Sequence, residues 1–174
     1  RQIEVKALQK MRGALTAATA ALVYCRIKRL DFLKHADFFT PIFALVYGAG
    51  RLGCFFAGCC YGRATLLPWS IKFPSGVEAP PGIPLHPTQL YAMLLEFATL
   101  AFLVWAERKK IFKAKGQLFA TWIVMHGVGR LIMEAFRGDY RGRLIFSLTV
   151  SELISYALVI VGIALFLKQR KSEA

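Results

Sequence analysis

Polar residues inside long apolar stretches are the first candidates for chemistry in this sequence, because a lipid environment makes such groups costly. Five are charged and one is a histidine: Arg51, Glu96, Arg130, Glu134, Glu152 and His126. A buried helix–helix pair, or a side chain that reaches the membrane surface, is the alternative explanation for any one of them. That explanation stays open for Glu96 and Glu152, whereas two patterns mark the others as functional.

The first pattern is a polar stripe. His126, Arg130, Glu134 and Arg137 follow one another at spacings of four, four and three residues, which places them on one face of a helix. We expect Arg130 and Glu134 to pair with each other. An imidazole accepts protons near neutral pH, so His126 is a candidate base. The alternative for this residue is a histidine bonded to a neighbouring helix.

The second pattern is a pair of arginines at one depth. Arg51 lies 14 residues beyond Asp37, and Arg130 lies 13 residues beyond Gln117, where two of the apolar stretches begin. At 1.5 Å per helical residue, both arginines lie about 20 Å from the same boundary. The guanidinium fork matches phosphate oxygens. Arg51 and Arg130 are therefore predicted to bind the phosphate of a lipid headgroup.

Glycines surround Arg51. The run from Gly48 to Arg63 reads GAGRLGCFFAGCCYGR, and it predicts a broken or re-entrant segment that lines a cavity. Gly50, Gly53 and Gly62 are candidate substrate-binding positions, since their backbone can approach a ligand closely. Tight packing of helices through small residues is the alternative.

Three cysteines fall in the same run. Cys54, Cys59 and Cys60 raise the question of zinc, but there is no matching C-x-x-C pair and no suitably spaced histidine. We expect small buried thiols and no metal site. A disulfide through Cys59 or Cys60 is the alternative if this segment faces an oxidising compartment.

A further polar run, His86-Pro87-Thr88-Gln89-Leu90-Tyr91, opens the next apolar stretch. Proline suits the first turn of a helix because it needs no N–H partner there. His86, Gln89 and Tyr91 are candidate substrate-binding residues that would orient a polar headgroup. An N-terminal cap with an interfacial tyrosine explains them equally well.

Composition indicates which elements must position these residues. The chain has 174 residues, of which 56% are hydrophobic and only 19% charged, a balance that argues against a soluble enzyme and against disorder. We predict an all-α polytopic transmembrane helix bundle of about five spans. The first is marginal, and the predicted ranges are Gly13–Cys25, Asp37–Phe56, Pro87–Ala106, Gln117–Phe136 and Phe146–Leu167.

The net charge of +13 is gathered in short clusters between these spans, which argues against nucleic acid as a partner. Twelve basic residues lie in connections on one side and five on the other; the twelve are Arg26, Lys28, Arg29, Lys34, Arg108, Lys109, Lys110, Lys113, Lys115, Lys168, Arg170 and Lys171. The positive-inside rule makes the first side, with the C-terminus, cytoplasmic. We expect one membrane domain over 1–174, with an atypical head at 1–12 and a proline-rich outer loop at 64–86.

Three of these runs together resemble the motifs of the prolipoprotein diacylglyceryl transferase family. They are the glycine-rich run Gly48–Arg63, the run His86–Tyr91, and Gly129–Arg137 with its R-x-x-x-E-x-x-R pattern. The resemblance implies a bacterial inner-membrane enzyme without metal or organic cofactor. Such an enzyme moves the diacylglyceryl group of phosphatidylglycerol onto the lipobox cysteine of prolipoprotein signal peptides. Its expected partners are therefore these peptides and membrane lipids, with phosphatidylglycerol as the donor. The resemblance assigns Arg51 and Arg130 to the leaving phosphate, with Glu134 holding Arg130 and Arg137 guiding headgroup entry.

The sequence departs from the family pattern at several positions. Family members usually have Asn at Cys54, Glu at Cys59 and Tyr at His126, and they carry further spans upstream. The chain is therefore expected to be either a fragment or a divergent branch. It is expected to bind phosphatidylglycerol but to transfer slowly or not at all. An inactive lipid- or lipoprotein-binding homologue is the first alternative function, and a small transporter subunit is the second.

Overall fold

The computed structural model describes residues 2–138 and 148–171, and side chains from Thr16 onward within the first helix. Within these residues, five helices run in the order α1 (Gln2–Ile27), α2 (Phe32–Phe56), α3 (Thr88–Arg108), α4 (Gln117–Phe136) and α5 (Val150–Lys171). The helices α2 to α5 are each long and apolar enough to cross a membrane. The predicted all-α membrane bundle is confirmed.

The predicted spans agree with these helices to within a few residues at most ends. Helix α4 has the predicted bounds, Gln117–Phe136, and α2 ends at the predicted Phe56. The marginal first span, Gly13–Cys25, is part of one longer helix, Gln2–Ile27. The predicted start of the last span at Phe146 lies outside the described residues, where α5 is seen from Val150.

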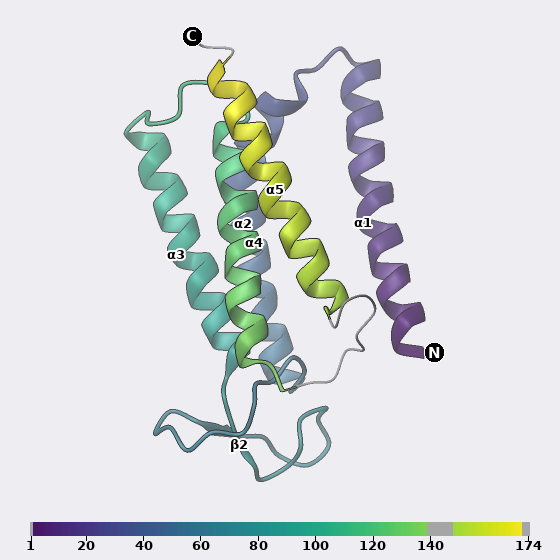
Figure 1. Cartoon of the computed structure of the whole chain (residues 1–174), viewed down its shortest axis with the longest axis vertical. Helices are drawn as coiled ribbons and strands as arrows, with labels where there is room; N and C mark the ends of the chain where they lie inside the picture. The colour runs from purple at the N-terminus through teal and green to yellow at the C-terminus, as the bar shows by residue number, and fades with distance from the viewer. Residues whose placement is uncertain (1, 139–147, 172–174) are drawn as a thin grey trace.

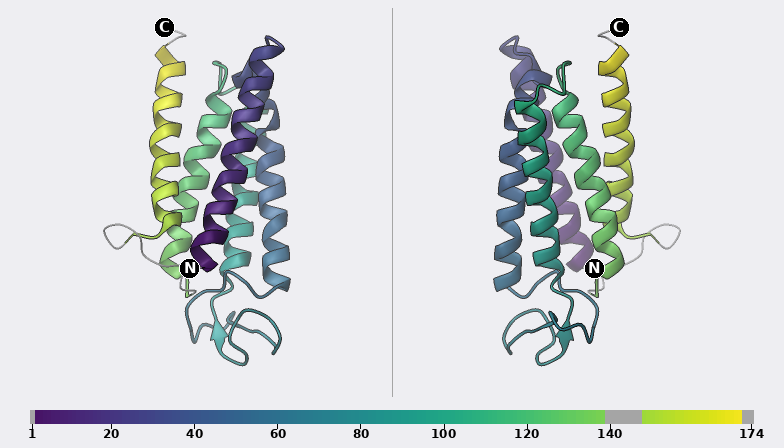
Figure 2. Two further views of the ribbon diagram at one scale, coloured as in Figure 1. Left: turned by 90° about the vertical axis from the view of Figure 1, so that its right-hand side faces the viewer. Right: turned by 90° about the vertical axis from the view of Figure 1, so that its left-hand side faces the viewer.

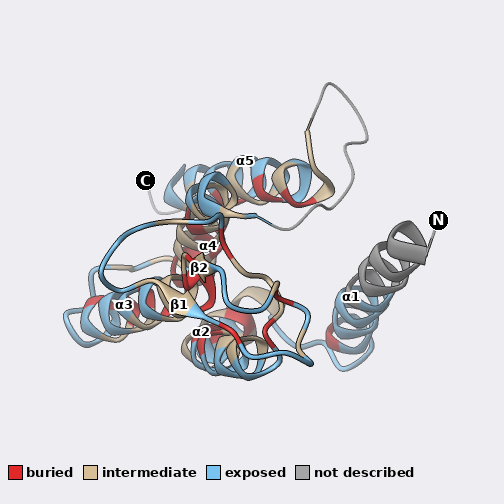
Figure 3. Cartoon of the chain, turned by 90° about the horizontal axis from the view of Figure 1, so that it is seen from below, coloured by how far each residue is buried: buried red, intermediate tan, exposed pale blue. Residues whose placement is uncertain are grey.

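Helices α2 to α5 pack together, while α1 stands apart from them (Figures 1 and 3). Of the α1 side chains from Thr16 to Ile27, only Cys25 is buried. Large apolar side chains on the outside of α2 to α5 are also exposed, as a lipid-facing surface requires.

Small residues set how closely the bundle helices approach. A Cβ on Gly127 of α4 would lie 3.1 Å from the Ser155 carbonyl oxygen of α5, and a Cβ on Gly162 would lie 3.1 Å from the Ala120 carbonyl oxygen. Gly48 of α2 lies against the Phe97 ring of α3 in the same way. In lipid, where no hydrophobic effect drives helices together, such close contacts supply much of the association energy.

The two ends of the bundle differ. The α1–α2 connection, the α3–α4 connection and the end of α5 lie together at one end (Figures 1 and 2), which we call the basic end. The predicted grouping of the three basic clusters on one side is confirmed. The connection between α2 and α3 lies at the opposite end, which we call the loop end.

The connection between α2 and α3 has structure of its own, so the expectation of a plain loop was incomplete. Strands β1 (Ile71–Lys72) and β2 (Pro84–Leu85) pair antiparallel within it. Leu85 of β2 forms a small buried cluster with Phe73 and Ala79. Prolines favour a loop by removing donors, but they do not prevent a two-residue ladder between segments that this cluster brings together.

At the basic end, an aspartate of α2 holds the start of α4. The Asp37 carboxylate accepts hydrogen bonds from the backbone N–H groups of Gly116, at 2.5 Å, and Phe119, at 2.8 Å. These N–H groups have no partner within a helix, and the positive end of the α4 dipole favours the negative charge. Asp37 thus fixes where α4, and with it the polar stripe, begins.

Candidate functional site

Tyr47 brings the two candidate phosphate ligands together. Its phenol oxygen accepts a hydrogen bond from Nη2 of Arg51, one turn further along α2, and another from Nη1 of Arg130 on α4, at 3.0 Å. The Arg51 guanidinium also lies over the Tyr47 ring, 4.6 Å from its centroid. The predicted convergence of Arg51 and Arg130 is confirmed, and a single phenol oxygen achieves it.

Both arginines line one cavity. Helices α2, α3 and α4 form its walls, together with the turn after α2. The whole predicted stripe of α4 faces it, and its polar lining residues are Tyr47, Arg51, Cys60, Thr88, Glu96, His126, Arg130, Glu134 and Arg137. The spacing of four, four and three therefore identified one face of α4 correctly.

The partners of Arg130 and Glu134 differ from those expected. Arg130 donates to Tyr47 and, through Nη2, to the Ser151 hydroxyl of α5. Glu134 accepts a hydrogen bond from the Thr149 hydroxyl at 3.0 Å, and its other oxygen lies 3.9 Å from Nε of Arg137. The expectation that Arg130 and Glu134 pair was wrong, because Ser151 of α5 and Thr149 just before α5 offer them hydroxyls that the spacing within α4 does not reveal.

Glu96 of α3 anchors the deep side of the cavity. Its carboxylate accepts hydrogen bonds from Nε1 of Trp122, at 2.7 Å, and from Nδ1 of His126, at 3.0 Å. The side chains of His126 and Glu96 are only 11% and 6% exposed. In the neutral tautomer that donates Nδ1–H to Glu96, Nε2 of His126 carries the lone pair. The Tyr47 ring packs edge-on against the imidazole, with the ring centroids 4.4 Å apart. This arrangement orients a base.

The glycine-rich run divides into an unbroken helix and a turn. Helix α2 continues through Gly48, Gly50 and Gly53 to Phe56, so the expected break or re-entrant segment is not what these residues form. Gly50 and Gly53 are exposed, and a Cβ on either would meet nothing within 4 Å. Neither glycine lines the cavity.

Gly62 allows the loop to pack closely against the end of α4. It is buried and pairs with Arg137 in an antiparallel bridge. A Cβ added to Gly62 would clash, because it would lie only 2.9 Å from the Phe136 carbonyl oxygen. A side chain there would push the loop away from the end of α4.

The residues of the His86–Tyr91 run hold the loop and the turn. Gln89 is buried and donates from Nε2 to the Cys59 carbonyl at 2.7 Å. The Tyr91 hydroxyl accepts a hydrogen bond from Nε1 of Trp69 and lies 3.3 Å from Nδ1 of His86. Oε1 of Gln89 has no hydrogen-bond partner among the described residues. Thr88, the neighbour of Gln89, reaches the cavity wall.

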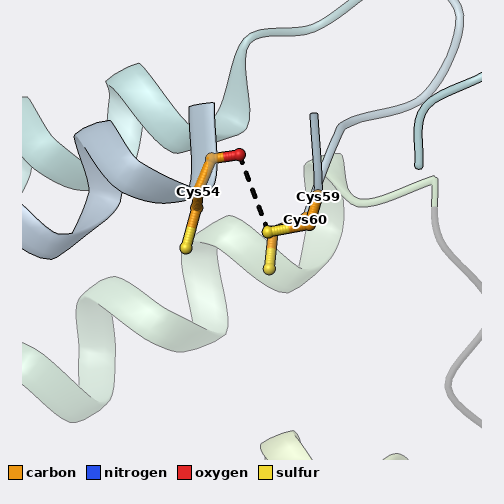
Figure 4. Close-up of side chains that lie close together, drawn as sticks. All are labelled: Cys54, Cys59 and Cys60. Carbon is orange, nitrogen blue, oxygen red and sulfur yellow. Dashed lines mark hydrogen bonds between the residues drawn. The ribbon is translucent and has the colours of Figure 1, made fainter. Parts of the chain in front are cut away.

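The turn after α2 brings the three cysteines together, which their spacing did not indicate. Their sulfur atoms all lie within 4.8 Å of one another (Figure 4). Cys54 and Cys59 carry free thiols. Burial, followed by the neighbouring Cys60 and Cys54, raises the pKa of Cys59 to about 12, so this thiol stays protonated at neutral pH and is a poor nucleophile by itself.

Sequence reasoning missed the hydrogen-bond acceptors and donors that organise the charged groups. These are Tyr47, Trp122, Thr149 and Ser151. A signal was present for two of them, since Tyr47 precedes Arg51 by four residues and Trp122 precedes His126 by four, so each shares a helix face with that residue. Thr149 and Ser151, just before and within α5, carry no such signal, because only tertiary packing brings them to α4.

Fold and site define a polytopic membrane protein with an arginine-lined cavity near the loop end of its bundle. A sequence model described as prolipoprotein diacylglyceryl transferase matches residues 11–168. The chain belongs to the prolipoprotein diacylglyceryl transferase family.

Named relatives agree with this assignment. A phosphatidylglycerol–prolipoprotein diacylglyceryl transferase of Clostridium tetani is 42% identical over 149 residues, which cover 86% of this chain and 59% of the relative. The second such transferase of Clostridium perfringens is 37% identical over 164 residues, covering 91% and 63%. One from Desulfotalea psychrophila is 33% identical over 152 residues, covering 83% and 54%. The chain thus spans somewhat less than two thirds of the length of these relatives.

Proposed function

We propose that this chain transfers the diacylglyceryl group of phosphatidylglycerol onto the thiol of a lipobox cysteine in prolipoprotein signal peptides. The thiol sulfur attacks the glyceryl carbon that bears the phosphate, and a thioether C–S bond forms. The C–O bond to the phosphate breaks, and its electron pair leaves with glycerol phosphate. The reaction requires a base for the thiol proton and positive charge at the leaving phosphate.

The observation that carries the proposal is the convergence of Arg51 and Arg130 on the Tyr47 hydroxyl. Each guanidinium has five N–H donors, and the contacts with described residues use one at Arg51 and two at Arg130. The donors that remain are available to a phosphate in the same cavity. Two fixed cations stabilise the charge that develops on the leaving group without rearranging.

His126 is the base in this proposal. Glu96 orients its imidazole, and Nε2 takes the proton that the attacking thiol loses. Glu96 touches neither substrate and acts as a positioning residue, because it fixes the tautomer and stabilises the imidazolium after proton transfer. Arg137, at the end of α4, guides the headgroup toward the two deeper arginines.

The proposed orientation places the basic end in the cytoplasm and the loop end outside a bacterial inner membrane. The basic clusters at the α1–α2 and α3–α4 connections and at the end of α5 support it. His86, Gln89 and Tyr91 then shape the outer rim, while Gly62 lets the loop close against α4. The loop end is where a signal peptide emerges after translocation, so its thiol reaches the cavity from that side.

The test reconstitutes the full chain in nanodiscs and measures two quantities. Binding is measured with phosphatidylglycerol and with the matching diacylglycerol, which lacks the phosphate. Transfer is measured by the mass gained by a lipobox peptide and by released glycerol phosphate. We expect phosphate-dependent binding and slow but measurable transfer. Arg51→Lys and Arg130→Lys should each reduce transfer by about 10²–10³-fold, since a point charge cannot replace the fork.

Arg108→Lys is the matched control, because Arg108 ends α3 at the basic end and is exposed. It should leave both quantities unchanged. Equal losses in all three variants would contradict the proposed site. Phosphate-dependent binding with no transfer at any time would instead support the lipid-binding homologue as the function.

The transporter alternative has less support. Below Glu96, toward the basic end, the described core includes an apolar cluster of Ala44, Leu103 and Leu118. The buried Thr40 and Thr99 hydroxyls in that region donate to backbone carbonyls of their own helices, so they do not extend the polar lining of the cavity.

A further inference from the structure

The strongest feature outside the proposed reaction is the group of three sulfur atoms at the end of α2. Cys54 lies in the last turn of α2, and Cys59 and Cys60 follow in the turn that leaves it (Figure 4). All three sulfurs lie within 4.8 Å of one another. Three sulfurs each 2.3 Å from a central ion in one plane would lie about 4.0 Å apart. The upper limit of 4.8 Å on the sulfur–sulfur distances therefore exceeds that spacing by less than an ångström.

The turn that presents these sulfurs is held from several directions. Cys60 has a φ of +59° and Gly58 a φ of +63°. The left-handed conformation is unfavourable for a residue with a Cβ, and it persists where surrounding contacts fix it. Those contacts are the Thr88 hydroxyl and the Gln89 amide, which donate to the carbonyl oxygens of Cys60 and Cys59 at 2.7 Å each.

These buried donors act as outer supports for the sulfur group. Thr88 and Gln89 are 4% and 1% exposed, so their hydrogen bonds do not compete with water. The Cys59 thiol itself points back to the Cys54 carbonyl, 3.6 Å away. The backbone thus directs all three side chains to one point before any ligand arrives, which lowers the cost of ordering them.

The ligand chemistry narrows the choice of ion. Thiolates select soft metals, chiefly Cu(I), zinc and iron–sulfur clusters. Zinc sites almost always use four ligands, whereas the group formed by the described residues has three members, all of them sulfur. Cu(I) is stable with three thiolates. The resulting charge of −2 would face Arg51, which lines the same cavity as Cys60.

We propose that Cys54, Cys59 and Cys60 bind one thiophilic d¹⁰ cation, Cu(I), at the end of α2. Each thiol releases its proton to solvent as its sulfur coordinates the ion, so three thiolates surround the bound Cu(I). This site adjoins the cavity of the proposed transfer reaction, because Cys60 lines that cavity, and it revises the sequence-based expectation of no metal. That expectation relied on spacing along the chain, whereas a turn with left-handed residues brings together sulfurs that no C-x-x-C pattern connects.

The experiment titrates the full chain in nanodiscs, under anaerobic reducing conditions, with Cu(I) against a chromophoric competitor and separately with Zn²⁺. We expect one Cu(I) per chain, and X-ray absorption should show three sulfur neighbours. Cys54→Ser, Cys59→Ser and Cys60→Ser should each weaken Cu(I) binding by more than about 100-fold, because each removes a ligand rather than an outer support.

Cys25→Ser is the matched control, since Cys25 lies near the end of α1 at the basic end. It should keep full affinity and stoichiometry. The thermal midpoint of each variant in the absence of metal is measured alongside, so that a folding defect is not read as ligand loss. Less than one Cu(I) per chain, equal weakening by Cys25→Ser, or tighter binding of Zn²⁺ with four neighbours would each overturn the proposal.

Discussion

The basic end and the loop end of the bundle handle charge in opposite ways. At the basic end, Asp37 meets the N-terminus of α4, and each carboxylate oxygen accepts a backbone N–H. At the loop end, the cations Arg51 and Arg130 meet at one neutral phenol oxygen. The first arrangement joins opposite charges, and the second gathers like charges.

The difference separates a stabilising contact from a prepared site. An acid at a helix N-terminus is satisfied in the folded protein and needs no ligand. Two guanidinium groups that share one acceptor repel each other, and an anion relieves that repulsion. Charge that is costly without a ligand is therefore the better guide to function in this chain, and changes at the two ends should affect different measured quantities.

The largest expected effect comes from His126→Gln. The variant keeps a polar group of similar reach but removes the proposed base, so transfer should fall by about 10²–10⁴-fold. Binding of phosphatidylglycerol should stay within a few-fold of that of the unmodified chain, because the proposed phosphate ligands, Arg51 and Arg130, are unchanged. Peptide lipidation and lipid binding are measured on the same nanodisc samples.

Glu96→Gln provides the comparison for that result. It keeps an acceptor oxygen for Nδ1 of His126 but removes the charge, so a smaller loss of transfer is expected than with His126→Gln. A parallel loss of lipid binding in His126→Gln would contradict the proposed role and would place His126 among the headgroup contacts.

The next largest effect is expected from Tyr47→Phe. The ring still packs on His126 and Arg51, but the shared acceptor is lost. A hydrogen bond to a charged group contributes about 1.5–3 kcal/mol, so phosphatidylglycerol binding should weaken by about 10–100-fold. Tyr156→Phe is the control, since Tyr156 is exposed on α5; a similar loss there would show that the effect does not arise at the cavity.

Much of this comparison was predictable from the sequence. Runs of apolar residues indicated the four long helices, because lipid permits few other structures. Helical spacing placed His126, Arg130, Glu134 and Arg137 on one face, and equal depth paired Arg51 with Arg130. These predictions succeeded because each depends on regular geometry within one helix or on a shared membrane boundary.

What the sequence did not predict depends on contacts between elements. Ser151 and Thr149 reach Arg130 and Glu134 only because α5 packs on α4. The three sulfurs meet only because Cys60 adopts a left-handed conformation. The sequence left open whether Glu96 was only part of a helix–helix pair, because its partner His126 is 30 residues away along the chain.

A moderate effect on stability alone is expected from Asp37→Ala at the basic end. Loss of a side-chain acceptor at a helix N-terminus costs about 1–2 kcal/mol, and here two N–H groups lose their acceptor. The free energy of unfolding, measured by denaturation in mixed detergent micelles, should fall by that amount while phosphatidylglycerol binding per folded molecule is unchanged. Asp37→Asn keeps one acceptor and should lose less. A selective loss of binding in Asp37→Ala would show that the two ends are not separate.

The smallest expected effect concerns the exposed pair of Asp31 and Lys115 at the same end. Nζ of Lys115 lies 2.7 Å from Oδ2 of Asp31. The hydrogen bond from Lys115, with a second from the Lys34 backbone N–H, lowers the pKa of Asp31 below 3.8. A lowered pKa in the folded state stabilises the protein above the unfolded value of 3.8, and that stabilisation disappears as the pH falls through the folded value.

The thermal midpoint of Asp31→Asn should therefore lie slightly below that of the unmodified chain at neutral pH, by less than for Asp37→Ala. The gap should close as the solution is acidified below pH 3.8. It should also narrow in about 1 M salt, where charges are screened within roughly 3 Å. Glu78→Gln, on the exposed loop at the other end, should show no such gap, and a gap for Asp31→Asn that persists in acid would assign the effect to something other than its charge.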